Sequence, residues 1–381
     1  MKKVNVLSLV ACGVLLSSSM AFGASKIDSA FKEGKVSGSL ALYGEKHNKS
    51  NNTPDSGFGN ANATVAYETG SLDGFTAKAE FKGNLGLGEI EKYDRRDGAP
   101  FENNALITEA YAKYANDVFF VSAGRQAIEK LEWLGDYHEA VVAGITAIPD
   151  TVVVVGYTQR KAESGINLSE DFHEFNGNKG AYVLDVKYAG LKGVEFNPYY
   201  YSAPDVANWY GLKTTFTADM FGAVAHYAVS NEDSNKNGAQ SDGSIGHLEL
   251  NTTIEDFKAA VGYIKTDKDV GAGSMLAAEG DHINPFDTGL SVYDPNAKTV
   301  YGSVGYTIAS VELGALYGET KYGTDYKETE LNLTAKYPIT EALTAKILYG
   351  DVNADEAGEA TKGSKASADD KYVFASVEYK F

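Results

Sequence analysis

The ionisable residues of one short segment are the best placed to do chemistry. Between Gln126 and Glu139, carboxylates, an ammonium and an imidazole follow one another, interrupted by the apolar pair Trp133 and Leu134. The ionisable residues are Glu129, Lys130, Glu132, Asp136, His138 and Glu139. Their spacing differs from that of a zinc-binding H-E-x-x-H pair, and no Ser/His/Asp set stands out in the chain. Mixed charges of this kind favour selection of dissolved ions by an electric field over catalysis.

One further segment has a partial metal-binding pattern. Asp233-Ser-Asn-Lys-Asn-Gly238 matches the start of a calcium loop, but the twelfth position is Ser244 instead of Glu. A loosely bound surface Ca²⁺ is the one cofactor that the sequence suggests, and a flexible polar loop is the alternative. The Gly83–Gly88 segment has the wrong order of glycines for a dinucleotide fingerprint. We therefore expect no cofactor and no enzymatic activity.

The charged residues outside this segment lie on predicted β-strands. From Phe75 to Leu85, apolar residues alternate with Lys78, Glu80 and Lys82, so an extended chain has one apolar and one charged face. The same alternation recurs at 36–45, 182–188, 330–337, 343–349 and 371–381. Period-2 patterns along the whole chain predict an all-β protein.

The connections between these strands fall into two alternating classes. The short ones are 70–74, 116–117, 148–150, 189–193, 218–220, 254–256, 309–310 and 338–341. The long ones begin near residues 47, 86, 126, 161, 203, 231, 267, 319 and 352. This alternation predicts an antiparallel barrel of about 18 strands, with long loops at one end and short turns at the other.

The charged face of each strand, opposite the apolar one, indicates whether the interior of the barrel is dry or filled with water. Unpaired charges are too costly to bury in a dry core, so in a barrel of this size they face a water-filled lumen. The pattern alone also permits a sandwich with these charges in outer solvent. The predicted wall residues are Lys78, Glu80, Lys82, Glu109, Lys113, Asp185, Lys187, Lys213, Lys258, Glu330, Lys336 and Lys346.

Two long connections are candidates to fold inward. We expect the segment 126–139 to narrow the lumen with its six ionisable residues, anchored on the inner wall by Trp133 and Leu134. A short amphipathic helix on the rim is the alternative. The connection 267–298 is expected to cover the mouth, with a surface loop as its alternative.

The N-terminus predicts export. Lys2 and Lys3, an apolar run over 4–16 and small residues up to 24 form a secretory signal peptide. A loose lipobox at 9–12 offers a lipoprotein as the rival interpretation. A periplasmic lead-in over 25–34 and a single barrel over 35–381 follow. Cys12 is the only cysteine, so no disulfide is expected, and the net charge of −18 argues against a nucleic-acid partner and favours cations.

Aromatic residues cluster on the apolar face beside the short turns. They are Tyr67, Phe75, Tyr114, Phe119, Tyr188, Phe196, Phe216, Phe221, Phe257, Tyr306, Tyr337 and Phe381. A second set lies toward the long loops: Tyr157, Tyr227, Tyr263, Tyr317 and Tyr349. Such rings are typical of the two membrane interfaces of a barrel, although aromatics are also good strand formers. The last strand ends on Phe381 and is predicted to pair with the first strand at 35–46.

Several short motifs resemble known porins. The segment Ile27–Gly38 looks like the first mature segment of epsilonproteobacterial porins, and Glu109–Tyr114, Val121–Gln126 and Asp150–Tyr157 are similar to a block that these porins share with the OprD-like group. The resemblance implies an 18-stranded barrel in the outer membrane of a Gram-negative bacterium. It also implies passive diffusion of small hydrophilic solutes and ions, contact with outer-membrane lipid, recognition of Phe381 by the barrel-assembly machinery, and a homotrimer.

The functional expectation is a diffusion porin with a mild preference for cations. The segment after Gly124-Arg-Gln126 lacks the Pro-Leu pattern of the OprD-like group, so narrow substrate specificity is not implied. A barrel that acts mainly as a surface adhesin or structural anchor is the alternative, and a secreted soluble β-protein is a third.

Overall fold

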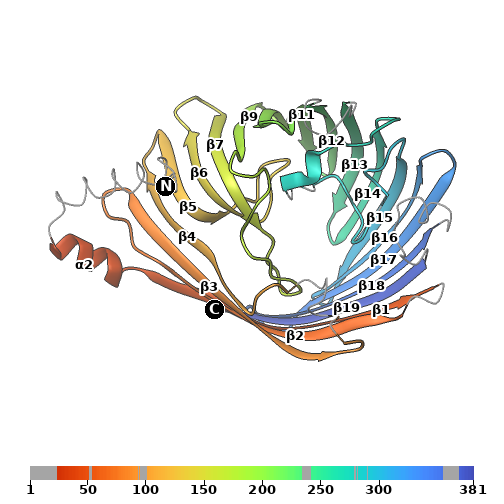
Figure 1. Ribbon diagram of the computed structural model, residues 1–381, viewed down its shortest axis with the longest axis horizontal. Helices are drawn as coiled ribbons and strands as arrows, with labels where there is room; N and C mark the ends of the chain where they lie inside the picture. The colour runs from red at the N-terminus through yellow and green to blue at the C-terminus, as the bar shows by residue number, and fades with distance from the viewer. Residues whose placement is uncertain are drawn as a thin grey trace.

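In the computed structural model, the chain forms a closed antiparallel barrel (Figure 1). The structure describes residues 24–50, 54–92, 94, 101–233, 242–278, 280, 282–289, 291–354 and 369–381. The first half of the wall consists of β1 (Lys35–Lys49), β2 (Ser56–Glu68), β3 (Phe75–Glu89), β4 (Ala105–Ala115), β5 (Phe119–Ala127), β6 (Tyr137–Ile145), β7 (Thr151–Ala162), β9 (Ala181–Leu191) and β10 (Val194–Ala203). The second half consists of β11 (Ala207–Ala218), β12 (Phe221–Glu232), β13 (Gly243–Ile254), β14 (Phe257–Thr266), β15 (Lys298–Ile308), β16 (Val311–Tyr322), β17 (Tyr326–Pro338), β18 (Leu343–Ala354) and β19 (Asp369–Lys380).

The wall has 18 strands, as the sequence predicts. The sheet has 19 strands in all, but β8 (His173–Glu174) pairs only with the end of β7 and is not part of the wall. β1 pairs with β2 on one side and with β19 on the other, with Leu42 opposite Val377 across the seam. Closure leaves no free edge, which removes the backbone groups that would otherwise pair with another chain.

The two ends of the barrel differ in their connections. All eight predicted short turns lie at one end, and the longest described connections, 163–180 and 267–297, lie at the other. Two connections that the sequence analysis placed among the long ones are tight: Pro204–Val206 and Gly323–Asp325. Asp205 and Gly323 have positive φ angles of 64° and 59°, which permit the chain to reverse within a few residues.

The outer surface of the barrel is apolar. Leu248 and Leu250 in β13 are 60% and 64% exposed, whereas His247, which alternates with them, is 8% exposed and faces inward. Some of the predicted aromatic positions face each other across neighbouring strands: Phe75 and Tyr114, Tyr188 and Phe196, and Phe257 and Tyr306. Within the described residues, no helix combines the length and apolarity needed to cross a bilayer.

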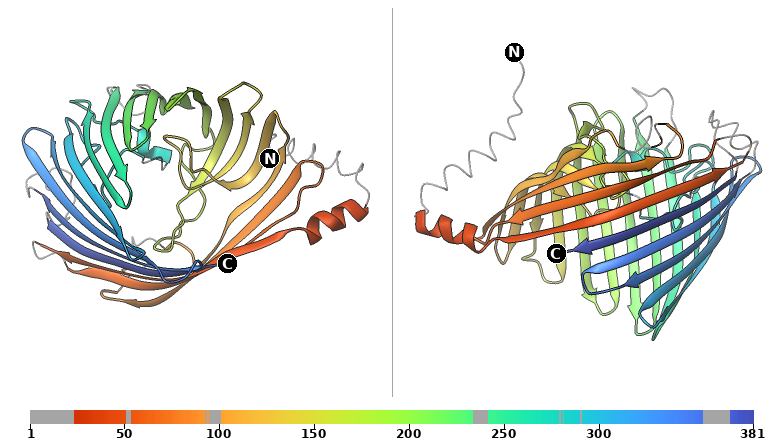
Figure 2. Two further views of the ribbon diagram at one scale, coloured as in Figure 1. Left: turned by 180° about the vertical axis from the view of Figure 1, so that it is seen from behind. Right: turned by 90° about the horizontal axis from the view of Figure 1, so that it is seen from below.

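A short helix precedes the barrel. α2 (Ala24–Lys32) lies beside the start of β1 and outside the wall (Figure 2). The Tyr67 hydroxyl donates to the Phe31 carbonyl, and the Gly70 amide donates to the Ala30 carbonyl at 2.8 Å, so the helix is held against the first short turn. It occupies most of the predicted lead-in. The predicted signal peptide lies almost wholly outside the described residues.

Candidate functional site

Loop 3, residues 128–136 between β5 and β6, folds into the barrel. Trp133 is fully buried, and its indole N–H donates to the Tyr199 hydroxyl of β10 at 2.8 Å. Leu134 is only 2% exposed and belongs to the same inner apolar cluster. These two residues anchor the loop on the inner wall, as the sequence predicts.

A polar network also attaches loop 3 to the wall. Glu132 is 5% exposed and lies 3.1 Å from the Lys213 ammonium of β11. Its backbone N–H donates to the Tyr201 hydroxyl at 3.1 Å, and that hydroxyl donates to Asp185 at 2.6 Å. The Lys187 ammonium donates to the Lys130 carbonyl at 2.8 Å. Glu132, Asp185, Lys187 and Lys213 therefore act as attachment points for the loop, a role that the sequence analysis did not assign to them.

Two of the six predicted constriction residues lie in β6, outside the loop. His138 is fully buried, with Nδ1 2.8 Å from the Thr158 hydroxyl and Nε2 2.9 Å from the Gly135 carbonyl. Glu139 alternates with His138 and forms ion pairs with Arg125 at 3.0 Å and Arg160 at 3.3 Å. Neither side chain narrows the lumen together with the loop carboxylates, because one is enclosed and the other points to the opposite face of the strand.

Three of the predicted constriction residues remain available to solutes. Glu129 and Lys130 are exposed, and Asp136 is half-buried at the end of the loop. Burial raises the pKa of Asp136 above its usual value, and the neighbouring Lys161 acts in the opposite direction. Loop 3 thus presents two carboxylates and one ammonium to the lumen.

Loop 7, residues 267–297, packs on loop 3 from the other side. Its short 3₁₀ helix, η1 (Met275–Ala278), buries Met275 and Ala278 in the inner apolar cluster. The Gly135 amide donates to the Ala278 carbonyl at 3.1 Å, and a side chain at Gly280 would overlap the backbone of Trp133. The two loops therefore form one packed unit inside the barrel.

The far part of loop 7 crosses to β17. Glu330 is 2% exposed and accepts hydrogen bonds from the amides of Thr288 and Gly289 at 3.1 and 2.8 Å, and from the Thr288 hydroxyl at 2.8 Å. The Tyr372 hydroxyl and the Asn332 amide complete its shell at 2.7 and 2.8 Å. These donors compensate the burial of the carboxylate. Glu330 was predicted to line the pore wall, but in the structure it is enclosed by loop 7.

Loop 4, residues 163–180, also crosses the lumen (Figure 1). The Ser164 hydroxyl accepts a hydrogen bond from the Lys82 ammonium of β3 at 2.7 Å, and the Ile166 carbonyl accepts one from Asn60 of β2 at 3.1 Å. Lys82 is only 6% exposed as a result. Loop 4 was not predicted as a pore element. Inward Lys82 and inward Asn60 on adjacent strands were the sequence features that could have indicated it.

Acidic and basic groups meet where loops 3 and 4 approach β3. Burial raises the pKa of Glu163, and Asp136 and Glu170 raise it further while Lys161 lowers it. Lys82 also interacts electrostatically with Asp136. Asp136, Glu163, Glu170, Lys82 and Lys161 therefore form one charged cluster where the two loops enter the lumen.

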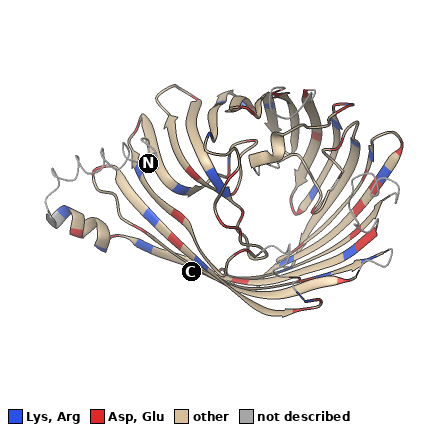
Figure 3. Cartoon of the chain, viewed as in Figure 1, with Lys and Arg blue, Asp and Glu red and all other residues tan. Residues whose placement is uncertain are grey.

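Below the loops, the wall carries the charged residues that the sequence predicts. Lys78 forms ion pairs with Glu109 and, at 3.7 Å, with Glu80, and the Lys113 ammonium lies 5.2 Å from the centre of the Phe120 ring. A cavity of about 440 Å³ lies against the inner face of β16–β19 and is lined by Glu312, Lys336, Lys346 and Tyr43, among others. Lys258 is exposed on β14. Figure 3 shows the acidic and basic residues interspersed along the strands and on the inner loops.

The described residues offer no metal site. Among them, no three His, Cys, Asp or Glu side chains are grouped so that they could hold an ion. The calcium-loop motif at 233–238 falls almost entirely outside the described residues. The charged wall and the folded loops can act on solutes through fixed charges, hydrogen bonds and steric exclusion.

Comparison with solved structures shows the same architecture. Acinetobacter baumannii OccAB1 superposes with a TM-score of 0.74 at 12% identity, over 93% of this chain and 98% of that one. Pseudomonas aeruginosa OpdO gives a TM-score of 0.75 at 13% identity, over 93% and 98% of the two chains. Pseudomonas aeruginosa OprD gives 0.68 at 13% identity, over 93% and 96%. The chain has the fold of OprD. No protein-family model matches it, and neither does any curated protein.

Proposed function

We propose that this protein is an outer-membrane porin through which small hydrophilic solutes and ions diffuse passively. One observation carries the proposal: a closed barrel with an apolar outside encloses a charged lumen that three folded loops narrow. No step of this mechanism breaks a bond, so a hydrated solute needs only a concentration gradient. The OprD-like fold supports the proposal independently of the sequence motifs.

The proposed location follows from the outer surface. Exposed aromatics lie near both ends of the strands, with aliphatic residues between them, and this is the distribution expected of a barrel in a bilayer. The short turns would then face the periplasm of a Gram-negative cell, and the loops the exterior. Outer-membrane lipid is the surrounding partner, and the barrel-assembly machinery would insert the chain by way of its terminal Phe381.

The proposed ion preference is mildly cationic. Glu129 and Asp136 of loop 3, Glu163 and Glu170 of loop 4, and Asp287 of loop 7 all lie at the level of the loops. Lys82, Lys130 and Lys161 oppose them. Carboxylates outnumber lysines in this set, so cations have the more favourable potential where the loops enter the lumen.

We extend the proposal to a homotrimer, whose contact surface would be the outer face of β1–β3. Ala61, Ala63 and Gly83 form a shallow depression there, next to Leu40 and Leu85. Small residues let two barrels approach closely without displacing side chains. Native mass spectrometry of the detergent-extracted protein tests this, with Ala63→Glu expected to shift the trimer to monomer.

Single-channel recording tests the function. Purified protein in a planar bilayer should give discrete conductance steps, and a KCl gradient should give a reversal potential of the sign for K⁺ preference. A folded barrel without conductance steps would instead favour an adhesin or anchor with a closed lumen. A reversal potential of the opposite sign would remove only the proposed cation preference.

A further inference from the structure

Four lysines stand side by side at the loop end of the outer surface. Lys265 of β14 lies directly opposite Lys298 of β15, Lys298 opposite Lys321 of β16, and Lys321 opposite Lys327 of β17. All four point outward, because Thr266, Thr299, Thr320 and Glu328, which alternate with them, are buried on the inner face. Directly opposed residues in a sheet have Cβ atoms about 5 Å apart, and like charges at that distance destabilise the pair.

The Glu319 carboxylate pairs with the two lysines at one end of this row. Glu319 lies 3.4 Å from the Lys321 ammonium and 2.7 Å from that of Lys327. Within the part of the chain that the structure describes, neither Lys265 nor Lys298 has a carboxylate in ion-pair range. Both are exposed. The two lysines at this end of the row therefore present an unbalanced positive charge to whatever surrounds the barrel.

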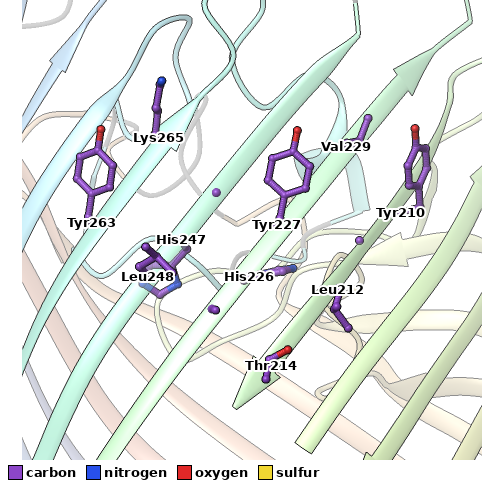
Figure 4. Close-up of a pocket in the computed structure, with 13 residues that line it drawn as sticks. Tyr210, Leu212, Thr214, His226, Tyr227, Val229, His247, Leu248, Tyr263 and Lys265 are labelled. Carbon is purple, nitrogen blue, oxygen red and sulfur yellow. The ribbon is translucent and has the colours of Figure 1, made fainter. Parts of the chain in front are cut away.

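An apolar groove of about 670 Å³ on the outer face of β11–β14 extends to Lys265, which lies opposite Lys298. Gly246 forms its floor: a Cβ built there would have no atom nearer than 3.7 Å, that of Tyr227, so the space above it is empty. Tyr227 and Lys265 are the register partners of Gly246 on its two sides. Figure 4 shows Tyr210, Tyr227 and Tyr263 on the strands around the groove, with Lys265 beyond Tyr263.

The height of the row matches that of a lipid headgroup. Lys265 follows the outward Tyr263 by two residues, which is about 7 Å along a strand. Tyr263 belongs to the ring of aromatics near the loop end, and such rings mark the boundary between hydrocarbon and headgroups. The groove begins level with Lys265, at Gly246, and continues past Leu248 and Ala225, which lie level with Tyr263, toward the middle of the bilayer. An acyl chain in its lower part would therefore lie below a headgroup that is bound at Lys265 and Lys298.

We propose that this surface is a binding site for a phosphorylated membrane lipid. One acyl chain would lie over Gly246 between Tyr227 and Tyr263, and a headgroup phosphate would bind Lys265 and Lys298. Phosphate supplies the negative charge that Lys265 and Lys298 lack, and the groove supplies an apolar contact that a free phosphate ion could not use. The inference rests on the membrane location within the proposed function, but not on conductance.

Lipid titration with native mass spectrometry tests the site. The probe is a diglucosamine lipid with two phosphates, added to the detergent-solubilised, delipidated full chain, and the same lipid without phosphates is the comparison. Replacing Lys265 and Lys298 by Gln should weaken binding about thirtyfold, which corresponds to about 1 kcal/mol per lysine. The matched control is Lys371→Gln, since Lys371 is an exposed lysine at the same end on β19 that already has Asp351 at 3.7 Å. It should bind as the unmodified chain does.

The groove is tested separately by Gly246→Leu, which fills the empty space and should also weaken binding. Its control is Gly44→Leu on β1, where a built Cβ also has no contact nearer than 3.8 Å. The proposed site would be overturned if Lys371→Gln or Gly44→Leu weakened lipid binding as much as the variants at the site do. It would also be overturned if the unmodified chain bound the lipid without phosphates as tightly as the lipid with them. Heat-modifiable migration verifies that every variant is folded. An unmodified chain that conducts normally but does not bind the phosphorylated lipid contradicts this inference alone. An unmodified chain that binds the lipid but gives no conductance contradicts the proposed function alone.

Discussion

Gly38 and Phe381 exchange both of their backbone hydrogen bonds across the barrel seam, each 3.0 Å long. The last residue of the chain is therefore part of the closure between β1 and β19. A Cβ on Gly38 would lie 2.8 Å from the Phe381 ring and would overlap the Thr64 carbonyl oxygen, so the absence of a side chain at Gly38 permits this contact.

Deletion of Phe381 should lower the yield of folded barrel, because it removes two seam hydrogen bonds and one outward aromatic. Gly38→Val should do the same through steric overlap. Gly44→Val is the matched control, since its Cβ would meet nothing closer than 3.8 Å. Heat-modifiable migration on gels measures the folded fraction. Normal folding of the Phe381 deletion variant would contradict the importance of the seam.

Trp133→Ala should release loop 3 from the inner wall. Truncating a buried Trp costs about 3–5 kcal/mol, and the Tyr199 hydroxyl also loses its indole partner. We expect a higher and noisier single-channel conductance. Trp133→Phe keeps most of the packing and should change the conductance much less. If the two variants changed the conductance equally, the packing of this ring would not be what holds loop 3 on the wall.

Lys82→Met should loosen loop 4 by removing the hydrogen bond to Ser164. The conductance should rise and the cation preference should increase, because one positive charge leaves the narrow region. Lys346→Met, lower on the inner wall, is the control: it removes a charge of the same sign without touching a loop. A conductance increase in the control alone would show that loop 4 does not limit the current.

The Glu129 and Asp136 carboxylates of loop 3 should contribute to the preference of the channel for cations over anions. Combining Glu129→Gln with Asp136→Asn should lower the K⁺ over Cl⁻ permeability ratio about fivefold per charge, because a unit charge about 8 Å away in water attracts K⁺ and repels Cl⁻ by about 0.5 kcal/mol each. Reversal potentials in a KCl gradient give the ratio. Glu132→Gln should leave it nearly unchanged while weakening loop attachment, since Glu132 is paired with Lys213 and enclosed. A larger selectivity change in Glu132→Gln would reverse this assignment.

Selectivity should also depend on pH through Asp287. Burial raises the pKa of Asp287 to about 6, with a further contribution from Glu330; His47 opposes the shift and Glu45 adds to it. Above pH 6 the group is negative and attracts cations, and below pH 6 it is neutral. The cation preference should therefore fall as pH decreases from 7.5 to 5, and Asp287→Asn should remove the component centred near pH 6. An identical pH profile in the variant would contradict this.

Most of the wall was predictable from the sequence, because apolar and polar residues alternate strictly in a strand that has one face toward lipid and the other toward water. Lys78 and Glu80, for instance, could be placed on the inner face directly. The positions of the short turns followed from Gly, Asp and Pro between such runs. The tight connections at Pro204–Val206 and Gly323–Asp325 were not predicted, since polar residues around them also suit long loops.

The arrangement of the lumen was less predictable. Alternation shows that Glu330 and Asp185 point inward, but it cannot show which inward residues are then covered by a loop from elsewhere in the chain. Glu330 is covered by loop 7, and Asp185 by the attachment of loop 3. Loop 4 was missed for the same reason: its contacts with Asn60 and Lys82 are more than 80 residues distant in sequence.

Current through single molecules in a planar bilayer tests the central claim most directly. Purified protein that shows heat-modifiable migration should produce stepwise, ohmic conductance with a reversal potential of the sign for cation preference. The same preparation, unfolded by heat before addition, should produce none. A folded preparation that inserts into the bilayer and yet gives no conductance steps would contradict the assignment as a diffusion channel.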